Sequence, residues 1–118
     1  MDNERLFAAC IEVVEELRQA VFIPWRTGNM ATNSLRYKIE GNVFHIYMDE
    51  EIAPYVPYTN EPWISPRWHG KTNPNEGWWN DFAEIFAQRL ALKLRGELIY
   101  GIAYAISTNN RTGINVTA

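Results

Sequence analysis

The chain has 118 residues, of which 47% are hydrophobic, 14% aromatic and 21% charged, with a net charge of −3 at pH 7. This length and apolar fraction predict one globular domain, residues 1–118, and exclude wholesale disorder. The mean hydropathy is −0.32 and no apolar run approaches about 18 residues, so we expect no membrane contact. The acidic balance argues against a general nucleic-acid-binding protein. The single cysteine excludes an intrachain disulfide, and the acidic start is unlike a secretory signal.

Residues 3–22 are predicted to form the first amphipathic helix, which Pro24 would end. Its apolar residues follow the spacing i, i+3, i+4, i+7, which is typical of one buried helix face. Residues 33–49 are then predicted to form a β-hairpin around the turn Gly41-Asn42. The second arm is apolar at most positions, which favours it as the more central strand.

From residue 54 the composition changes, and we expect a long Pro/Trp-rich loop over residues 54–77. The stretch from Pro54 to Trp79 holds five of the six prolines and four of the five tryptophans. It shows neither helical nor strand periodicity. Long ordered loops in small domains are usually functional, and disordered segments are seldom so rich in tryptophan.

A second amphipathic helix is predicted over residues 78–95, a strand over 97–107, and a tail over 108–118 in which a short strand at 114–116 stays open. Ile99, Gly101, Ala103 and Ala105 share one face of the predicted strand, and this face of mostly small residues favours a helix or a neighbouring chain packed over it. This element order predicts an α+β fold: an antiparallel sheet of three to four strands packed by two amphipathic helices.

Candidate catalytic groups are few, and no enzyme, metal site or cofactor is expected. Cys10 lies on the apolar stripe of the first helix, which favours a buried thiol over a nucleophile. Neither His45 nor His69 has a second histidine at metal-ligand spacing. Two acidic groups are candidate cation or proton sites: Asp49, Glu50 and Glu51, and the pair Asp81 and Glu84. A solvated turn explains the first group more simply, and a favourable helix N-terminus explains the second.

The stretch from Pro54 to Trp79, which we call the aromatic segment, is the strongest candidate for a binding surface. Trp, Tyr and Arg are enriched at interface hot spots. Two interpretations stay open for its rings: interface anchors, with Trp78 and Trp79 included, or a satellite core folded back onto the sheet. The predicted partner-binding residues are Tyr55, Tyr58, Trp63, Arg67, Trp68, His69 and Lys71.

Charge is distributed unevenly along the chain. Residues 1–61 carry a net charge of −5 and residues 62–118 a net charge of +2. Copies could therefore associate acidic side to basic side, a heterologous contact that builds rings, unless the fold brings both halves onto one surface.

Three short motifs in order carry a resemblance to a known family. Residues 26–30 read RTGNM after the first helix, Ser34-Leu35 opens a strand, and residues 53–58 read APYVPY after the second strand. This pattern resembles the small neck, or head–tail joining, proteins of long-tailed bacteriophages, which carry a TGNL…S(I/L) segment and a YA.YV.(Y/F) segment. Met30 stands where the family usually has Leu, Pro54 interrupts the second motif, and the Trp-rich stretch replaces a shorter loop.

The resemblance implies a non-enzymatic structural protein of the virion, made in the host bacterial cytoplasm. Such proteins are also described as minor capsid or tail-completion proteins. They form homo-oligomeric rings that join the portal-side connector of the capsid to the tail-side proteins. Thr27, Gly28 and Asn29 would then form a structural turn, and the loop would face a neighbouring subunit or the connector.

Two other functions remain as alternatives. The aromatic loop with its nearby cations could serve a small binding module for nucleic acid or carbohydrate, through stacking on bases or sugars. A metal-dependent hydrolase that uses Asp49, Glu50 and Glu51 is the third hypothesis.

Overall fold

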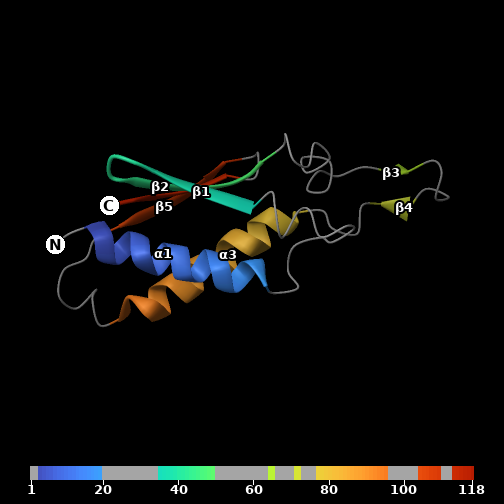
Figure 1. Ribbon diagram of the computed structural model, residues 1–118. Coiled ribbons are helices and arrows are strands. Elements are labelled where there is room, and N and C mark those ends of the chain that lie inside the picture. The colour runs from blue at the N-terminus through green and yellow to red at the C-terminus, as the bar shows by residue number, and fades with distance from the viewer. Residues whose placement is uncertain are drawn as a thin grey trace.

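The computed structural model describes residues 3–19, 35–49, 64–65, 71–72, 77–95, 104–109 and 113–118. It contains a four-stranded antiparallel sheet and two helices, which confirms the predicted α+β class (Figure 1). The elements are α1 (Asn3–Arg18), β1 (Leu35–Glu40), β2 (Val43–Met48), β3 (Ile64–Ser65), β4 (Lys71–Thr72), α3 (Trp78–Lys93), β5 (Ala105–Asn109) and β6 (Gly113–Thr117).

The sheet has the strand order β1-β2-β6-β5, and every neighbouring pair is antiparallel. β1 and β2 form the predicted hairpin, with Glu40 opposite Val43 at its closed end. Gly41 has φ 60° in the turn, a backbone conformation that costs glycine little because it has no Cβ. β2 is central and β1 is an end strand, as the more apolar second arm predicted.

The C-terminal segment is the other central strand, β6, and the predicted boundary between a strand and a tail at residue 108 is wrong. Thr108 belongs to β5, opposite Ile114 of β6, and Ile114 also lies opposite Ile46 of β2. Ile114 and Val116 are fully buried, so the short apolar alternation over residues 114–116 belongs to a core strand. Pairing on both sides supplies the stability that so short a segment lacks on its own.

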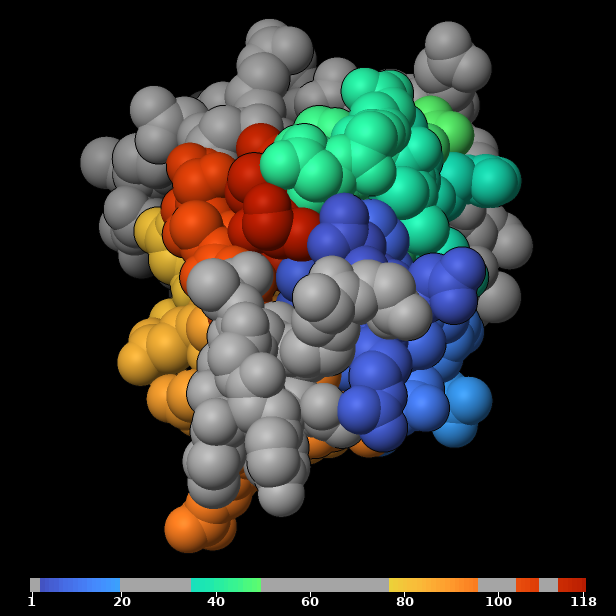
Figure 2. All heavy atoms as spheres, turned by 90° about the vertical axis from the view of Figure 1, so that its left-hand side faces the viewer, coloured from blue at the N-terminus to red at the C-terminus, as the bar shows by residue number. Residues whose placement is uncertain are grey.

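The two helices cover one face of the sheet (Figure 1). Figure 2 shows this end-on: the green β1 and β2, the red β6 and the orange-red β5 lie above, and the blue α1 and orange α3 lie below. The sheet therefore buries only the side chains that point toward the helices. The buried core residues are Leu6, Phe7, Cys10, Val13, Val14, Leu17, Leu35, Phe44, Ile46, Met48, Trp78, Trp79, Phe82, Ala83, Phe86, Leu90, Leu94, Ile114 and Val116.

Two element boundaries differ from the predicted ones. The first helix ends at Arg18 with a turn at Gln19, not at residue 22. Residues 20–24, including the predicted end of this helix, lie outside the described residues. The strand expected over 97–107 is described at Ala105–Asn109, where it pairs with β6 as far as Asn109 opposite Gly113. Residues 97–103 lie outside the described residues.

A second, two-stranded sheet occurs inside the segment that was expected to lack strands. β3 and β4 pair in antiparallel fashion, with Ile64 opposite Thr72 and Ser65 opposite Lys71. The pair lies apart from the four-stranded sheet (Figure 1). Two-residue strands carry too few positions to show a period of two, which is why the sequence pattern did not reveal them.

Candidate functional site

The predicted partner-binding residues fall almost entirely outside the described part of the chain. Lys71 is described through its backbone, which pairs with Ser65 in the β3–β4 ribbon. The other members of the set, and the predicted turn, lie outside the described residues: Tyr55, Tyr58, Trp63, Arg67, Trp68 and His69, and Thr27, Gly28 and Asn29.

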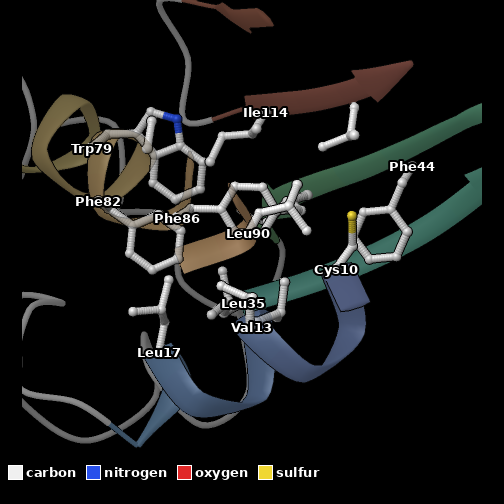
Figure 3. Close-up of a cluster of buried hydrophobic side chains, with 14 of the residues drawn as sticks. Cys10, Val13, Leu17, Leu35, Phe44, Trp79, Phe82, Phe86, Leu90 and Ile114 are labelled. Carbon is white, nitrogen blue, oxygen red and sulfur yellow. The ribbon is translucent and has the colours of Figure 1, made fainter. Parts of the chain in front are cut away.

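Trp78 and Trp79 are core residues, so their interpretation as interface anchors is wrong. Trp79 has no exposed surface and Trp78 is 5% exposed. Trp79 stacks on Phe82 with ring centroids 4.9 Å apart, and Trp78 packs edge-on against Trp79 at 5.4 Å. Figure 3 shows Trp79 and Phe82 in the space between α3 and the sheet, in the same cluster as Ile114 of β6. The aromatic segment therefore ends in a buried anchor.

The candidate site that the structure does describe is the outer face of the sheet, opposite the helices. Strand alternation and register place one row of side chains across all four strands. Lys38 of β1 is opposite His45 of β2, His45 is opposite Asn115 of β6, and Asn115 is opposite Ser107 of β5. We call Lys38, His45, Asn115 and Ser107 the central row. Its members are exposed or half-buried, so this face presents ordered polar groups to the surroundings.

His45 is held at the middle of the central row from both sides. Its Nδ1 is hydrogen-bonded to the amide oxygen Oδ1 of Asn115. Its Nε2 lies 3.6 Å from the carboxylate of Glu40, which Lys38 Nζ approaches to 3.1 Å. Asn115 thus orients the imidazole, whose other nitrogen faces the carboxylate of Glu40.

The border of the outer face along β1 is charged. Arg36 Nε lies 3.5 Å from the carboxylate of Asp49, and Lys38 Nζ lies 5.7 Å from the ring centroid of Tyr47. Arg36 and Lys38 are both more than half exposed, so these contacts are screened by solvent and add little stability. The β5 side of the same face has no charged residue in the strand. The face is therefore asymmetric in charge from one end strand to the other.

The catalytic candidates of the sequence do not meet in the described residues. Cys10 is fully buried, and desolvation raises the pKa of its thiol to about 12, so it is a protonated core residue at neutral pH. Asp49 is paired with Arg36, while Glu50, Glu51 and His69 lie outside the described residues. No three His, Cys, Asp or Glu side chains are grouped to hold a metal ion within the described ranges.

Asp81 and Glu84 are exposed near the start of α3, where they line a shallow depression with Trp78 and Ile85. Carboxylates in this position interact favourably with the positive end of the helix dipole. That explains the pair without a ligand.

Between the helices, the acidic and basic halves of the chain meet within one molecule. Lys93 Nζ of α3 lies 2.7 Å from a carboxylate oxygen of Glu16 and 3.3 Å from one of Glu12, both on α1. Arg89 Nη1 lies 3.5 Å from Glu16. The hydrogen bond with Lys93 lowers the pKa of Glu16 and raises that of Lys93. The acidic residues of α1 and the basic residues of α3 therefore form ion pairs within one molecule. The uneven charge of the two halves had predicted such pairs between separate copies.

Comparison with known proteins adds no relative: no family model, no curated protein and no solved structure matches the chain. Neither described helix is both long and apolar enough to cross a membrane.

Proposed function

We propose that this chain is a structural virion protein of a tailed bacteriophage, a neck or head–tail joining protein. In this role it assembles as a ring between the connector of the capsid and the tail. The observation that carries the proposal is the ordered series RTGNM, Ser34-Leu35 and APYVPY, which resembles the segments of that family at matching places along the chain.

The geometry supports a protein that works through contacts with other proteins. Both described helices cover one face of the sheet, and the other face presents the central row of polar side chains. The two end strands, β1 and β5, lie on opposite sides of that face. A single-layered sheet with an ordered polar face and two end strands is suited to repeated contacts around a ring.

Gene deletion with complementation tests the proposal directly. In a phage that lacks this gene, we expect filled heads and complete tails to accumulate unjoined, and the purified chain to restore joined particles in a mixed extract. Electron microscopy then counts joined particles. Normal joining without the gene, or a gene located far from the portal, capsid and tail genes, would contradict the proposal.

The alternative, a binding module for nucleic acid or carbohydrate, loses part of its support in the structure. It relied on exposed tryptophans, and two of the four in the aromatic segment, Trp78 and Trp79, are buried. Titration with a mixed-sequence oligonucleotide and with a panel of sugars, followed by tryptophan emission, tests what remains. A saturable quench would favour the binding module, and unchanged emission would exclude it.

A further inference from the structure

The two end strands of the sheet differ in how they are protected against pairing with another chain. β1 carries Arg36, Lys38 and Glu40, which are all exposed. β5 has the sequence AISTN, with no charged residue and no proline, and its neighbour β6 has the sequence GINVT. Soluble proteins usually place charges, prolines or bulges on end strands, because an unprotected edge recruits further strands. β5 lacks the first two of these safeguards.

Among the described residues β5 is an end strand, and its side chains are small and mostly exposed. Ala105, Ser107 and Thr108 are exposed, and Ile106 is half-buried against the core. In Figure 2 the orange-red β5 lies at the side of the sheet opposite β1 and β2. A strand of this length with small, neutral side chains accepts a partner strand without steric or charge conflict.

We propose that β5 is an interface strand that pairs with β1 of a second copy of this chain, so that the sheet continues from one molecule into the next. The inference rests on the proposed ring, because it names the contact by which neighbouring copies would join.

The strand directions favour this pairing. Each strand is antiparallel to its neighbour in the order β1-β2-β6-β5, so β1 and β5 run in opposite directions. When a second copy in the same orientation is set beside the first, its β1 therefore runs antiparallel to β5. All helices then stay on one face of the extended sheet. Such a contact joins two different surfaces and is heterologous, which is the type that closes into rings.

The charges favour the same pairing over a contact between two β1 strands. The central row ends in Lys38 on one side and Ser107 on the other, so a continuing register brings Lys38 of the next copy beside a neutral hydroxyl. Two β1 strands paired about Lys38 would instead place like charges opposite each other, which is destabilising. Two β5 strands paired together carry no such penalty, and that contact is the outcome the experiment must separate.

The first experiment measures self-association of the full chain by analytical ultracentrifugation. The double variant Ser107→Lys/Thr108→Lys adds one charge to each face of β5 at exposed positions. We expect it to weaken association by about tenfold, since each misplaced charge in a cross-strand pair costs a factor of roughly two to five. The matched control Asn80→Lys/Gln88→Lys adds the same charge at exposed positions of α3 and should leave association unchanged.

The second experiment identifies the strand that pairs with β5. Lys38→Cys and Ser107→Cys each introduce one accessible thiol, and the buried Cys10 does not compete. A short bis-maleimide should cross-link an equimolar mixture of the two variants into a heterodimer and give little product with either variant alone. A dominant Ser107→Cys homodimer would overturn the inference in favour of β5–β5 pairing.

Failure of this inference can be told apart from failure of the proposed function. The edge contact would be overturned if the Ser107→Lys/Thr108→Lys variant associated as tightly as the control variant. A wild-type chain that stays monomeric at about 1 mM would overturn it as well. The head–tail joining assay would be unaffected by either result. Conversely, a chain that assembles through β5 but does not join heads to tails would retain the contact and lose the function.

Discussion

The indole nitrogen Nε1 of Trp79 donates a hydrogen bond to the backbone carbonyl of Gly113, at 3.4 Å. This bond links the first turn of α3 to the first residue of β6, although the two residues are 34 positions apart. Trp79 is completely buried, so the indole nitrogen, the only polar atom of its side chain, has its partner inside the core. The last residue of the aromatic segment is thus hydrogen-bonded to a central strand of the sheet.

Two substitutions of Trp79 should separate the stability due to packing of its ring from that due to its hydrogen bond. Trp79→Ala removes the largest buried ring and should lower the free energy of unfolding by about 3–5 kcal/mol. Trp79→Phe keeps much of the packing but loses the bond to Gly113, and should cost less, about 1–2 kcal/mol. Urea denaturation followed by far-ultraviolet circular dichroism measures both. Equal effects of the two variants would contradict the role of the hydrogen bond.

Trp63→Ala and Trp68→Ala should behave differently from Trp79→Ala. Both positions belong to the predicted partner-binding set, so we expect each variant to keep the wild-type unfolding midpoint but to restore fewer joined particles in the head–tail assay. A variant that unfolds the isolated chain would instead place that ring in the core and contradict the interface assignment. Trp79→Ala serves as the positive control for loss of folding.

The fold class followed from local patterns, whereas β6 depended on contacts that no local pattern shows. The helices and the β1–β2 hairpin have strong periodicity and a clear Gly-Asn turn, so they were predictable. Ile114 and Val116 are only two apolar positions in a polar tail, and their burial comes from pairing with β2 on one side and β5 on the other. Such long-range pairing is set by the whole sheet and not by the segment.

The helical spacing of Trp79 indicated burial, but the adjacent Pro/Trp-rich stretch suggested an interface role instead. Trp79, Phe82, Phe86 and Leu90 follow the spacing i, i+3, i+7 and i+11 of one helix face, which is the signal that marks a buried stripe. The predicted helix 78–95 includes Trp79, but its place directly after the proline-rich stretch grouped its role with that of the loop tryptophans. The central row had no such signal, because His45 and Asn115 come together only through the sheet register.

Phe86→Ala should destabilise the chain by about 3–5 kcal/mol, because Phe86 is completely buried in the centre of α3 and a cavity would remain. Leu92→Ala is the matched control on the same helix, since Leu92 is 70% exposed and should change the free energy of unfolding by less than about 0.5 kcal/mol. Urea denaturation of the two variants makes the comparison. Similar losses for both would contradict the described face of α3.

The ion pairs between α1 and α3 should make stability depend on acid pH. The hydrogen bond with Lys93 lowers the pKa of Glu16 in the folded chain, so its stabilising effect is present above the unfolded carboxyl pKa. That effect is lost as the pH falls through the folded pKa. Glu16→Gln should therefore flatten the acid side of the unfolding midpoint against pH, most clearly at low salt. Glu84→Gln, an exposed change on α3, should leave it as in the wild type.

The thiol of Cys10 should report global unfolding. Because it is fully buried and its pKa is raised to about 12, we expect negligible reaction with a thiol reagent at neutral pH in the native chain and full reaction in urea. Burial also raises the pKa of the neighbouring Tyr104. For a raised pKa, the stabilising effect is complete below the unfolded value and is lost as the pH rises toward the folded value, so stability should fall above about pH 9.

Cys10→Ala separates the thiol from the tyrosine in this alkaline range. The variant lacks the thiol, so its free energy of unfolding should decline less steeply with rising pH, although Tyr104 and Lys93 still contribute in the same direction. Urea denaturation at several pH values from neutral to alkaline measures the two slopes. Rapid labelling of the native thiol at neutral pH, or identical alkaline slopes with and without it, would show that Cys10 is not sealed between α1 and the sheet.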